Sequence, residues 1–261
     1  MNRVSVIIPN WNGASFVGKA IESALKQGNQ VAEVLVCDDG STDESANVVA
    51  AYTDPRVKWL PGPHGGLPAK PRNRGIQVAQ SEYLAFLDND DVWLPGKLES
   101  QLERIKDRNI SVVSSNAWRV VDGQRKGLLL PYNASEILTF RKLARENRVI
   151  CSSALVRRND VLRAGGFSED LKFKAVEDYH LWLRMAELGN VFYEATPLIE
   201  YRDQPALSIR GRDNAASQRL FWVYKDYARS RVTKVQQWPK AAYIALLSTW
   251  RKLKTLQTKK F

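Results

Sequence analysis

Three acidic groups in the sequence have residue types and spacing that could do chemistry. The most concentrated is Asp88-Asn89-Asp90-Asp91, which follows the apolar run Tyr83–Leu87. Three carboxylates within four residues repel one another, and burying them without partners would be costly. A divalent cation relieves both problems, because Mg²⁺ and Mn²⁺ prefer oxygen ligands. We therefore predict a metal and diphosphate site at Asp88 and Asp90.

Helix capping is the alternative use of these acids. Asp90 or Asp91 could cap a helix that begins near 93–95. One cap does not require three acids, so we assign capping to Asp91 alone. The preceding run has strand length and suits a central strand covered on both faces, and open α/β sheets hold their ligands at such strand ends.

A second acidic group, Asp38-Asp39, follows the apolar stretch Val34–Cys37. A carboxylate after an early strand can accept hydrogen bonds from a ribose or a base N–H. The competing interpretation is an Asx turn, which we keep for Asp43, while we favour nucleotide binding for Asp39. Trp11 could stack on a base, or it could be an ordinary core tryptophan.

The third group, Glu177-Asp178, precedes an apolar segment that predicts a helix. Acids in a first helical turn are favoured by the helix dipole, which would explain them without any function. A carboxylate at a helix start can also act as a general base whose position the helix fixes. The residues alone leave both interpretations open. We expect His180, in the same turn, to be structural or to lie on the surface.

The elements that must position these acids alternate between strand and helix. Buried strands are predicted at Val4–Ile8, Val34–Cys37, Val57–Leu60 and Tyr83–Leu87. Helices are predicted at about 15–27, 44–52 and 72–79. This alternation predicts an α/β fold with a parallel sheet of the nucleotide-binding type. Farther along the chain we expect helices over 98–108 and 136–146, and strands over 110–114 and 150–156.

Composition limits the class of protein. The chain has 261 residues with 44% hydrophobic and 26% charged content, which are ordinary globular values. No apolar run reaches the roughly 18 residues that a membrane span needs, and residues 1–20 lack the features of a signal peptide. Two distant cysteines, Cys37 and Cys151, indicate a reducing compartment, so we expect a cytoplasmic protein.

The net charge of +11 is concentrated near the C-terminus. Residues 229–261 contain nine Lys or Arg and no acid, whereas the preceding residues contain 30 basic and 28 acidic side chains. Helices are predicted at 215–231 and 240–256, and the second has an apolar stripe that includes Tyr243, Leu247 and Trp250. Such a tail suits the anionic inner face of a cell membrane. The alternative is that the stripe packs on the main domain and the lysines are only solvated.

Taken in order, these motifs resemble family 2 glycosyltransferases of the GT-A fold. The matching segments are V-S-V-I-I-P-N-W-N-G (4–13), C-D-D-G-S-T-D (37–43), P-R-N-R-G-I (71–76), Y-L-A-F-L-D-N-D-D-V-W-L-P-G-K-L (83–98) and E-D-Y-H-L-W-L-R (177–184). The resemblance implies a central, mostly parallel sheet flanked by helices. It divides the chain into a GT-A domain over 1–205, with a nucleotide-sugar-binding half over 1–110 and an acceptor-side half over 111–205, and a basic helical tail over 206–261.

The resemblance also implies roles for individual residues on the donor side. Pro9, Trp11 and Asp39 match positions that line the nucleobase and ribose pocket. Asp88 matches the first acid of the D-x-D motif, which approaches the ribose or sugar. Arg72 matches a basic position with a role at the diphosphate or sugar.

Further implied roles concern the metal and the base. Asp90 matches the acid that holds Mn²⁺ or Mg²⁺ on the diphosphate, with Asp88 as a second candidate ligand. Asp178 matches the general base of inverting members. Many members have a further histidine about twenty residues after the base, whereas this chain has Tyr201-Arg202-Asp203-Gln204 there. Arg202 or Arg210 is the candidate that replaces it at the diphosphate.

The implied activity is the transfer of a sugar from a nucleotide sugar, most often a UDP-sugar, to an acceptor hydroxyl. The acceptor would be a saccharide or lipid-linked saccharide in cell-surface polysaccharide or lipopolysaccharide assembly. An inactive binding module of the same fold is one alternative, and the retention of Asp39, Asp90 and Asp178 argues against it. A nucleotidyltransferase usually has a Gly-rich loop with a basic residue after the first strand, and a dehydrogenase has G-x-G-x-x-G, where this chain has P-N-W-N-G. No nucleic-acid partner is expected, because no known binding module accompanies the basic tail.

Overall fold

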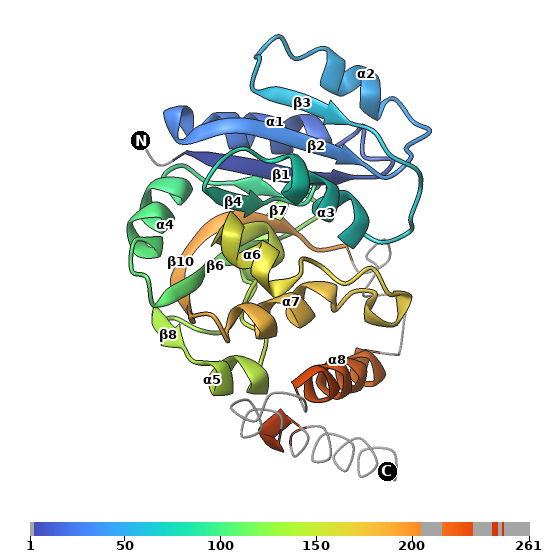
Figure 1. Cartoon of the computed structure of the whole chain (residues 1–261). Coiled ribbons are helices and arrows are strands. Elements are labelled where there is room, and N and C mark those ends of the chain that lie inside the picture. The colour runs from blue at the N-terminus through green and yellow to red at the C-terminus, as the bar shows by residue number, and fades with distance from the viewer. Residues whose placement is uncertain (1–2, 205–215, 232–241, 245–246, 248–261) are drawn as a thin grey trace.

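The computed structural model describes residues 3–204, 216–231, 242–244 and 247, and within them ten strands form one sheet (Figure 1). The strands are β1 (Val4–Asn10), β2 (Val31–Asp38), β3 (Val57–Leu60), β4 (Tyr83–Phe86), β5 (Val92–Trp93), β6 (Ile110–Val121), β7 (Gln124–Leu128), β8 (Glu136–Leu138), β9 (Leu155–Arg157) and β10 (Asn190–Arg202). The helices are α1 (Val17–Leu25), α2 (Ser45–Ala50), α3 (Ala69–Val78), α4 (Lys97–Ile105), α5 (Phe140–Arg145), α6 (Arg158–Ala164), α7 (Glu177–Met185) and α8 (Ala216–Arg231). Three short 3₁₀ helices are η1 (Gly28–Gln30), η2 (Cys151–Ser153) and η3 (Leu171–Phe173).

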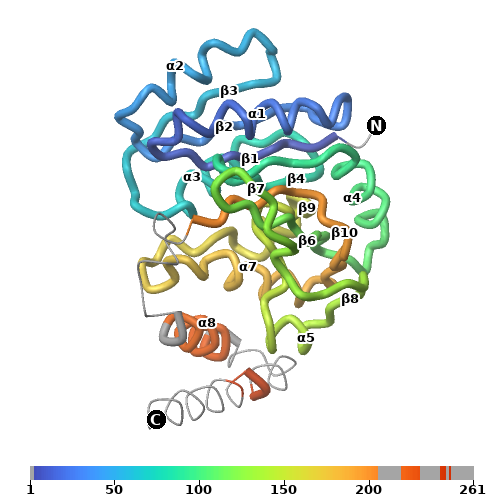
Figure 2. The backbone as a smooth tube through the Cα atoms, turned by 180° about the vertical axis from the view of Figure 1, so that it is seen from behind, coloured from blue at the N-terminus to red at the C-terminus, as the bar shows by residue number. Residues whose placement is uncertain are grey.

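The strands lie in the order β3-β2-β1-β4-β9-β6-β10-β5, with β7 paired to β6 and β8 to β10. The first four of these are parallel, as are β6 and β10, and the remaining pairs are antiparallel. The predicted α/β fold with a central, mostly parallel sheet flanked by helices is therefore confirmed. Beyond β4 the sheet continues through β9, which is antiparallel to both of its neighbours, to β6 and β10 (Figures 1 and 2).

Helices cover both faces of the sheet, and β1 is buried along its whole length. Its side chains alternate between two cores, as expected for a strand covered on both faces. Val6 and Ile8 belong to the core that α1 and α4 complete, whereas Ile7 belongs to the core that α3 and α7 complete. Packing of helices on both faces holds β1, β2 and β4 in place, and the residues that follow these strands line the candidate active site.

The helix predicted near 93–95, with Asp91 as its cap, is wrong. Val92–Trp93 forms the short strand β5 against β10, and α4 begins only after Gly96. The Trp93 indole donates to the Ser152 carbonyl at 2.7 Å, so burial of this ring sets the local conformation. Asp91 is 1% exposed, and its Oδ1 accepts a hydrogen bond from the Arg202 backbone N–H at 2.8 Å.

Two other predicted elements are shorter than expected. The helix expected over 136–146 is confined to α5, because residues 136–138 pair with β10 as strand β8. The strand expected over 150–156 begins only at Leu155, because Cys151–Ser153 forms η2. The Ser153 hydroxyl there accepts a hydrogen bond from the Ser115 backbone N–H at 3.0 Å. In both cases contacts with distant strands determined the backbone conformation.

The predicted helix at 215–231 is present as α8, which packs on the core below α7 (Figure 1). Val223, Tyr224 and Tyr227 are buried, and the Tyr224 hydroxyl donates to the Ala144 carbonyl at 2.9 Å. Most of the second predicted helix, 240–256, lies outside the described residues. Residues 242–244 are helical, and Ile244 is fully buried. None of the described helices has the length and apolar character needed to cross a bilayer.

Candidate active site

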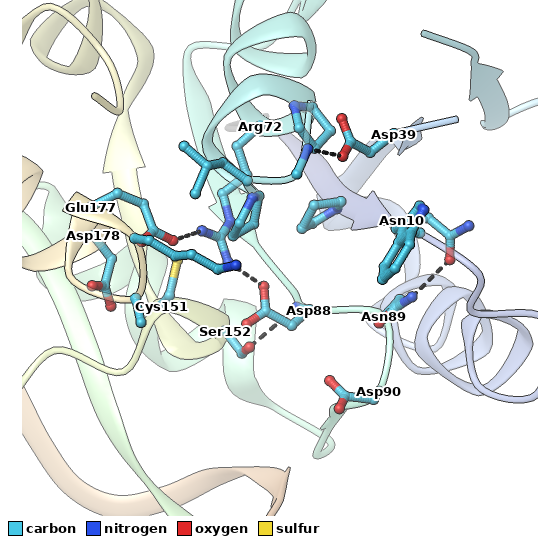
Figure 3. A pocket seen from close by; sticks show the side chains of 18 of the residues that line it. Asn10, Asp39, Arg72, Asp88, Asn89, Asp90, Cys151, Ser152, Glu177 and Asp178 are labelled. Carbon is cyan, nitrogen blue, oxygen red and sulfur yellow. Dashed lines mark hydrogen bonds and ion pairs between the residues drawn. The ribbon is translucent and has the colours of Figure 1, made fainter. Parts of the chain in front are cut away.

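A cavity of about 610 Å³ lies at the carboxyl ends of β1, β2 and β4 and extends to the start of α7. All seven predicted site residues line it: Pro9, Trp11, Asp39, Arg72, Asp88, Asp90 and Asp178. Figure 3 shows Asp39 on one side, Asp178 on the other, and Arg72 with Asp88 between them. In the sequence the three acidic groups follow two different strands and begin a helix. The fold brings all three into one cavity.

The Asp39 side of the cavity is built by the loop that follows β3. The two Asp39 carboxylate oxygens accept backbone N–H groups of Gly65 and Gly66 at 2.9 and 3.0 Å, and His64 Nδ1 lies 3.1 Å from Oδ2. Gly40 has φ of +77°, and a Cβ there would lie 2.7 Å from the His64 backbone nitrogen, so this contact requires glycine. Asp39 therefore holds this loop against the cavity.

Trp11 is not a core residue, because 54% of its surface is exposed. Its ring stacks on the imidazole of His64 with centroids 4.8 Å apart. An exposed, nearly flat aromatic surface of this kind suits stacking against a nucleobase. The Asx turn expected at Asp43 is present, since its carboxylate accepts the Ser45 backbone N–H at 3.0 Å.

The loop after β4 carries Asp88 and Asp90 into the cavity. The Ser152 hydroxyl accepts the Asp88 backbone N–H at 3.1 Å, and the Asn89 amide donates to Asn10 Oδ1 at 2.8 Å, which fixes the loop against β1. Burial, together with the neighbouring charge of Asp88, raises the pKa of Asp90 to about 6. A cation at Asp90 would offset both effects.

Arg72 lies between the two sides of the cavity and is 4% exposed. Its Nη2 donates to Asp88 Oδ1 at 2.6 Å, and its Nη1 donates to Glu177 Oε1 at 3.0 Å. Burial by itself would disfavour the guanidinium charge, but these carboxylates keep the pKa of Arg72 well above its ordinary value. Both terminal nitrogens are thus engaged by protein carboxylates.

Asp178 is in the first turn of α7 and is 6% exposed. Its Oδ1 accepts the Tyr179 backbone N–H at 2.7 Å, and the helix N-terminus favours its negative charge. Cys151 lines the same part of the cavity, and burial raises the pKa of its thiol well above the ordinary value. This cysteine is therefore a neutral thiol near pH 7, and it is not activated as a nucleophile.

The chemistry of the acids decides whether a metal fits. Among the described residues, no cluster of three or more His, Cys, Asp and Glu side chains is arranged to hold an ion. Asp90, with Asp88 beside it, still fits Mg²⁺ or Mn²⁺, because such ions often take one or two carboxylates and complete their shell with substrate phosphates and water. Asp91 is unsuited as a ligand, since it is buried and accepts the Arg202 backbone N–H.

Several cavity residues were missed by the sequence analysis. Ser152 and Asn10 carry no local motif that would reveal their contacts with the Asp88–Asp90 loop. Glu177 was visible only as part of an acidic pair, and its bond to Arg72 joins residues 105 positions apart. Lys174 also lines the cavity, as does Arg202, one of the two candidates for the diphosphate. The other candidate, Arg210, lies outside the described residues.

Comparisons with known proteins agree on one family. The family model described as Glycosyl transferase family 2 matches residues 5–166. The Escherichia coli protein named UDP-Glc:alpha-D-GlcNAc-diphosphoundecaprenol beta-1,3-glucosyltransferase WfgD is 31% identical over 72% of this chain and 71% of its own length. The putative teichuronic acid biosynthesis glycosyltransferase TuaG of Bacillus subtilis is 27% identical over 88% of this chain and 90% of its own.

Solved structures support the same fold. S. aureus TarS (residues 1–349) in complex with UDP-GlcNAc superposes with a TM-score of 0.77 at 19% identity, covering 97% of this chain and 73% of that one. The mannosyltransferase PcManGT from Pyrobaculum calidifontis, solved with GDP-Man and Mn²⁺, gives a TM-score of 0.65 at 21% identity over 95% and 71%. At these identities the likeness concerns the fold alone. The sequence match supplies the family, and the chain belongs to glycosyl transferase family 2.

Proposed function

We propose that this glycosyltransferase moves a sugar from a UDP-sugar to a hydroxyl of a saccharide carried on a lipid diphosphate, with inversion at the anomeric carbon. The observation that carries the proposal is the position of Asp178 in one cavity with Asp88, Asp90 and Trp11. A candidate base thus faces the same space as the candidate donor site. The names of WfgD and TuaG, and the UDP-GlcNAc complex of TarS, support the donor and acceptor classes.

Donor binding would use the side of the cavity opposite Asp178. Trp11 offers its exposed face to the base, and Asp39 has oxygen lone pairs left to accept a base N–H or a ribose hydroxyl. Pro9 borders the same region. Asp90, with Asp88 as second ligand, would hold Mn²⁺ or Mg²⁺, which when bound supplies Lewis-acid stabilisation of the leaving diphosphate. Arg202, whose charge also acts on Asp90, would contribute positive charge at that end.

The reaction needs one base. As the acceptor hydroxyl attacks the anomeric carbon, Asp178 takes its proton, and the nucleoside diphosphate leaves from the opposite face of the sugar. A single displacement requires no protein nucleophile, which agrees with the neutral state of the Cys151 thiol. The buried Arg72–Glu177 ion pair at the first turn of α7 would keep Asp178 in position.

If the acceptor is anchored in a lipid bilayer, the enzyme must reach it at the membrane surface. We propose a cytoplasmic enzyme that associates with the inner face of the cell membrane and takes part in cell-surface polysaccharide assembly. The basic residues between 229 and 261 supply the charge for such an association. Residues 1–205 would form the catalytic domain, with α8 and the basic segment after it.

The test is a panel of nucleotide sugars assayed for hydrolysis and for transfer, with Mn²⁺ or Mg²⁺ added. We expect turnover of one UDP-sugar, and loss of about 10²-fold or more of it in Asp178→Asn, the scale of general-base removal. Calorimetry with UDP should give the same affinity for wild type and Asp178→Asn. Asp122→Asn, at an exposed turn and not among the residues that line the cavity, is the matched control. Loss of UDP affinity in Asp178→Asn would move this residue to the donor site, and absence of turnover with every nucleotide sugar would contradict the proposed activity.

A further inference from the structure

Three Lys or Arg side chains among the described residues line the cavity, and two of them already have partners. Arg72 bonds to Asp88 and Glu177. Arg202 lies over the Phe16 ring at 3.7 Å, donates to Gln204 at 2.9 Å, and acts electrostatically on Asp90. Both arginines therefore already interact with the acids of the proposed donor site or with other side chains of the protein. The third is Lys174.

Lys174 has no carboxylate partner within the described part of the chain, in contrast to Lys172 two residues earlier. Lys172 pairs with Asp170 at 2.7 Å and lies 3.7 Å from Asp226. Lys174 is half-buried at the cavity wall. A cation that lines a cavity without an acid to pair with is a ready partner for an anionic ligand.

The backbone around Lys174 is held in an unusual conformation. The next residue, Ala175, has φ of +65°, which costs energy for a residue with a Cβ and persists only where the surroundings impose it. Arg219 of α8 imposes part of it, because its Nη1 donates to the Lys174 carbonyl at 2.8 Å. The turn that places Lys174 on the cavity wall is therefore held by a contact with α8.

The anion that Lys174 would meet is set by its place in the cavity. Lys174 lines the cavity four residues before Asp178, in the segment that leads into α7. Asp39 lies on the opposite side of the cavity from Asp178 (Figure 3). The charge of the donor diphosphate would be neutralised by the metal ion that Asp90 would hold and by Arg202. An anionic group near Asp178 must then belong to the acceptor, whose reacting hydroxyl Asp178 deprotonates.

We propose that Lys174 binds the diphosphate through which the acceptor saccharide is linked to its lipid. This inference rests on the proposed function and adds a residue that selects the class of acceptor. The phosphate on the anomeric carbon of a pyranose is one ring width from its attacking hydroxyl, which is within reach of a lysine side chain from a position close to the base. Ion pairing of this kind gives Lys174 a preference for diphosphate-linked over neutral acceptors.

The experiment compares two probes on the full chain saturated with UDP and Mn²⁺. One is N-acetylglucosamine on a short alkyl diphosphate, and the other is the same sugar on a neutral alkyl chain. We expect calorimetry to show a preference of about tenfold or more for the diphosphate probe in wild type, the scale of a hydrogen bond between charged groups. Lys174→Ala and Lys174→Met should lose this preference, and Lys174→Arg should retain it. Lys172→Ala is the matched control and should bind both probes as wild type does.

Three results would overturn the inference. One is equal binding, or no binding, of the two probes by wild type. Another is a preference that survives in Lys174→Ala and Lys174→Met. The third is an equal loss of affinity for both probes in these variants while their melting temperatures stay unchanged, which would assign Lys174 to general shaping of the site. Failure of the proposed function is distinguishable, because it would appear as absent turnover of every UDP-sugar by a wild type that still binds the diphosphate probe.

Discussion

Arg72 and Glu177, 105 positions apart in the sequence, form a buried ion pair with Nη1 and Oε1 3.0 Å apart. The same guanidinium donates to Asp88 at 2.6 Å. Asp88 follows the central strand β4, and Glu177 precedes Asp178 in the first turn of α7. A single side chain therefore joins the donor acids to the helix that carries the candidate base. The resemblance to family 2 glycosyltransferases implies that Arg72 acts at the diphosphate or sugar, and this role stays a prediction. In the structure both terminal nitrogens of Arg72 donate to protein carboxylates.

Arg72→Met should destabilise the protein strongly. The variant leaves the 4% exposed Glu177 without its partner, and removal of one member of a buried ion pair costs about 3–5 kcal/mol. Urea unfolding measures the change. Arg163→Met removes an exposed pair with Asp160 and should alter the free energy of unfolding by less than about 0.5 kcal/mol. A cost for Arg72→Met no greater than that of this control would show that the buried pair contributes little.

How much the sequence could predict depends on whether the signal is local. The strands that precede Asp39 and Asp88 were predictable, because each is a short apolar run followed closely by acids. The strand β8 was not, because its conformation depends on pairing with β10, more than fifty residues away. Likewise, the sequence placed Asp178 at a helix start but could not show that Arg72 connects it to Asp88. Contacts between distant elements are decided by packing, on which a single sequence carries little information.

Asp90→Asn should abolish metal-dependent turnover and yet stabilise the metal-free protein. The pKa of Asp90 is raised from 3.8 to about 6 by burial and by Asp88, so stability falls as pH rises from 3.8 to about 6, and the full penalty of the ionised form is present above that window. In EDTA at pH 7.5 the variant should gain about 1–2 kcal/mol of unfolding free energy, allowing for partial solvent screening. Asp122→Asn, at an exposed turn, should gain nothing. Turnover that persists in Asp90→Asn with excess EDTA would contradict the metal assignment.

His180 should make stability depend on acid pH. Of the two expected positions for this residue, structural or on the surface, the structure shows the first, since it is 5% exposed and stacks on Phe173 with centroids 4.3 Å apart. Burial, with a contribution from Arg184, lowers its pKa from 6.5 to about 4 despite the Asp226 carboxylate 3.1 Å away.

The sign follows from proton binding. Between pH 6.5 and about 4 the unfolded state binds a proton that folded His180 does not, so stability is complete above pH 6.5 and decreases as pH falls through this window. The loss should reach about 2–3 kcal/mol. Chemical unfolding at several pH values should give a flatter profile for His180→Asn than for wild type. Identical slopes for His180→Asn and wild type would exclude His180 as the cause.

The last prediction concerns the basic residues that follow α8. The predicted apolar stripe is in part covered by the domain: Tyr243 and Leu247 pack against the core, and the Tyr243 hydroxyl accepts a hydrogen bond from Arg145 Nε at 2.7 Å. Less apolar surface is then left for insertion into lipid, so attraction to a membrane should depend on charge and on salt.

The 261-residue chain should therefore sediment at low salt with liposomes that contain anionic lipid, and not with neutral phosphatidylcholine liposomes. Replacing Lys252, Lys254, Lys259 and Lys260 with Gln lowers the net charge from +11 to +7 and keeps every apolar residue. At about 1 kcal/mol per lysine near an anionic surface, this variant should lose most of the binding, and 0.5 M salt should release the wild type. A chain that ends after Arg231 should behave as the Gln variant does. Equal sedimentation of the wild type, the Gln variant and the shortened chain at low salt would contradict this prediction. It would show that the tail is a structural part of the domain and that another surface binds the membrane.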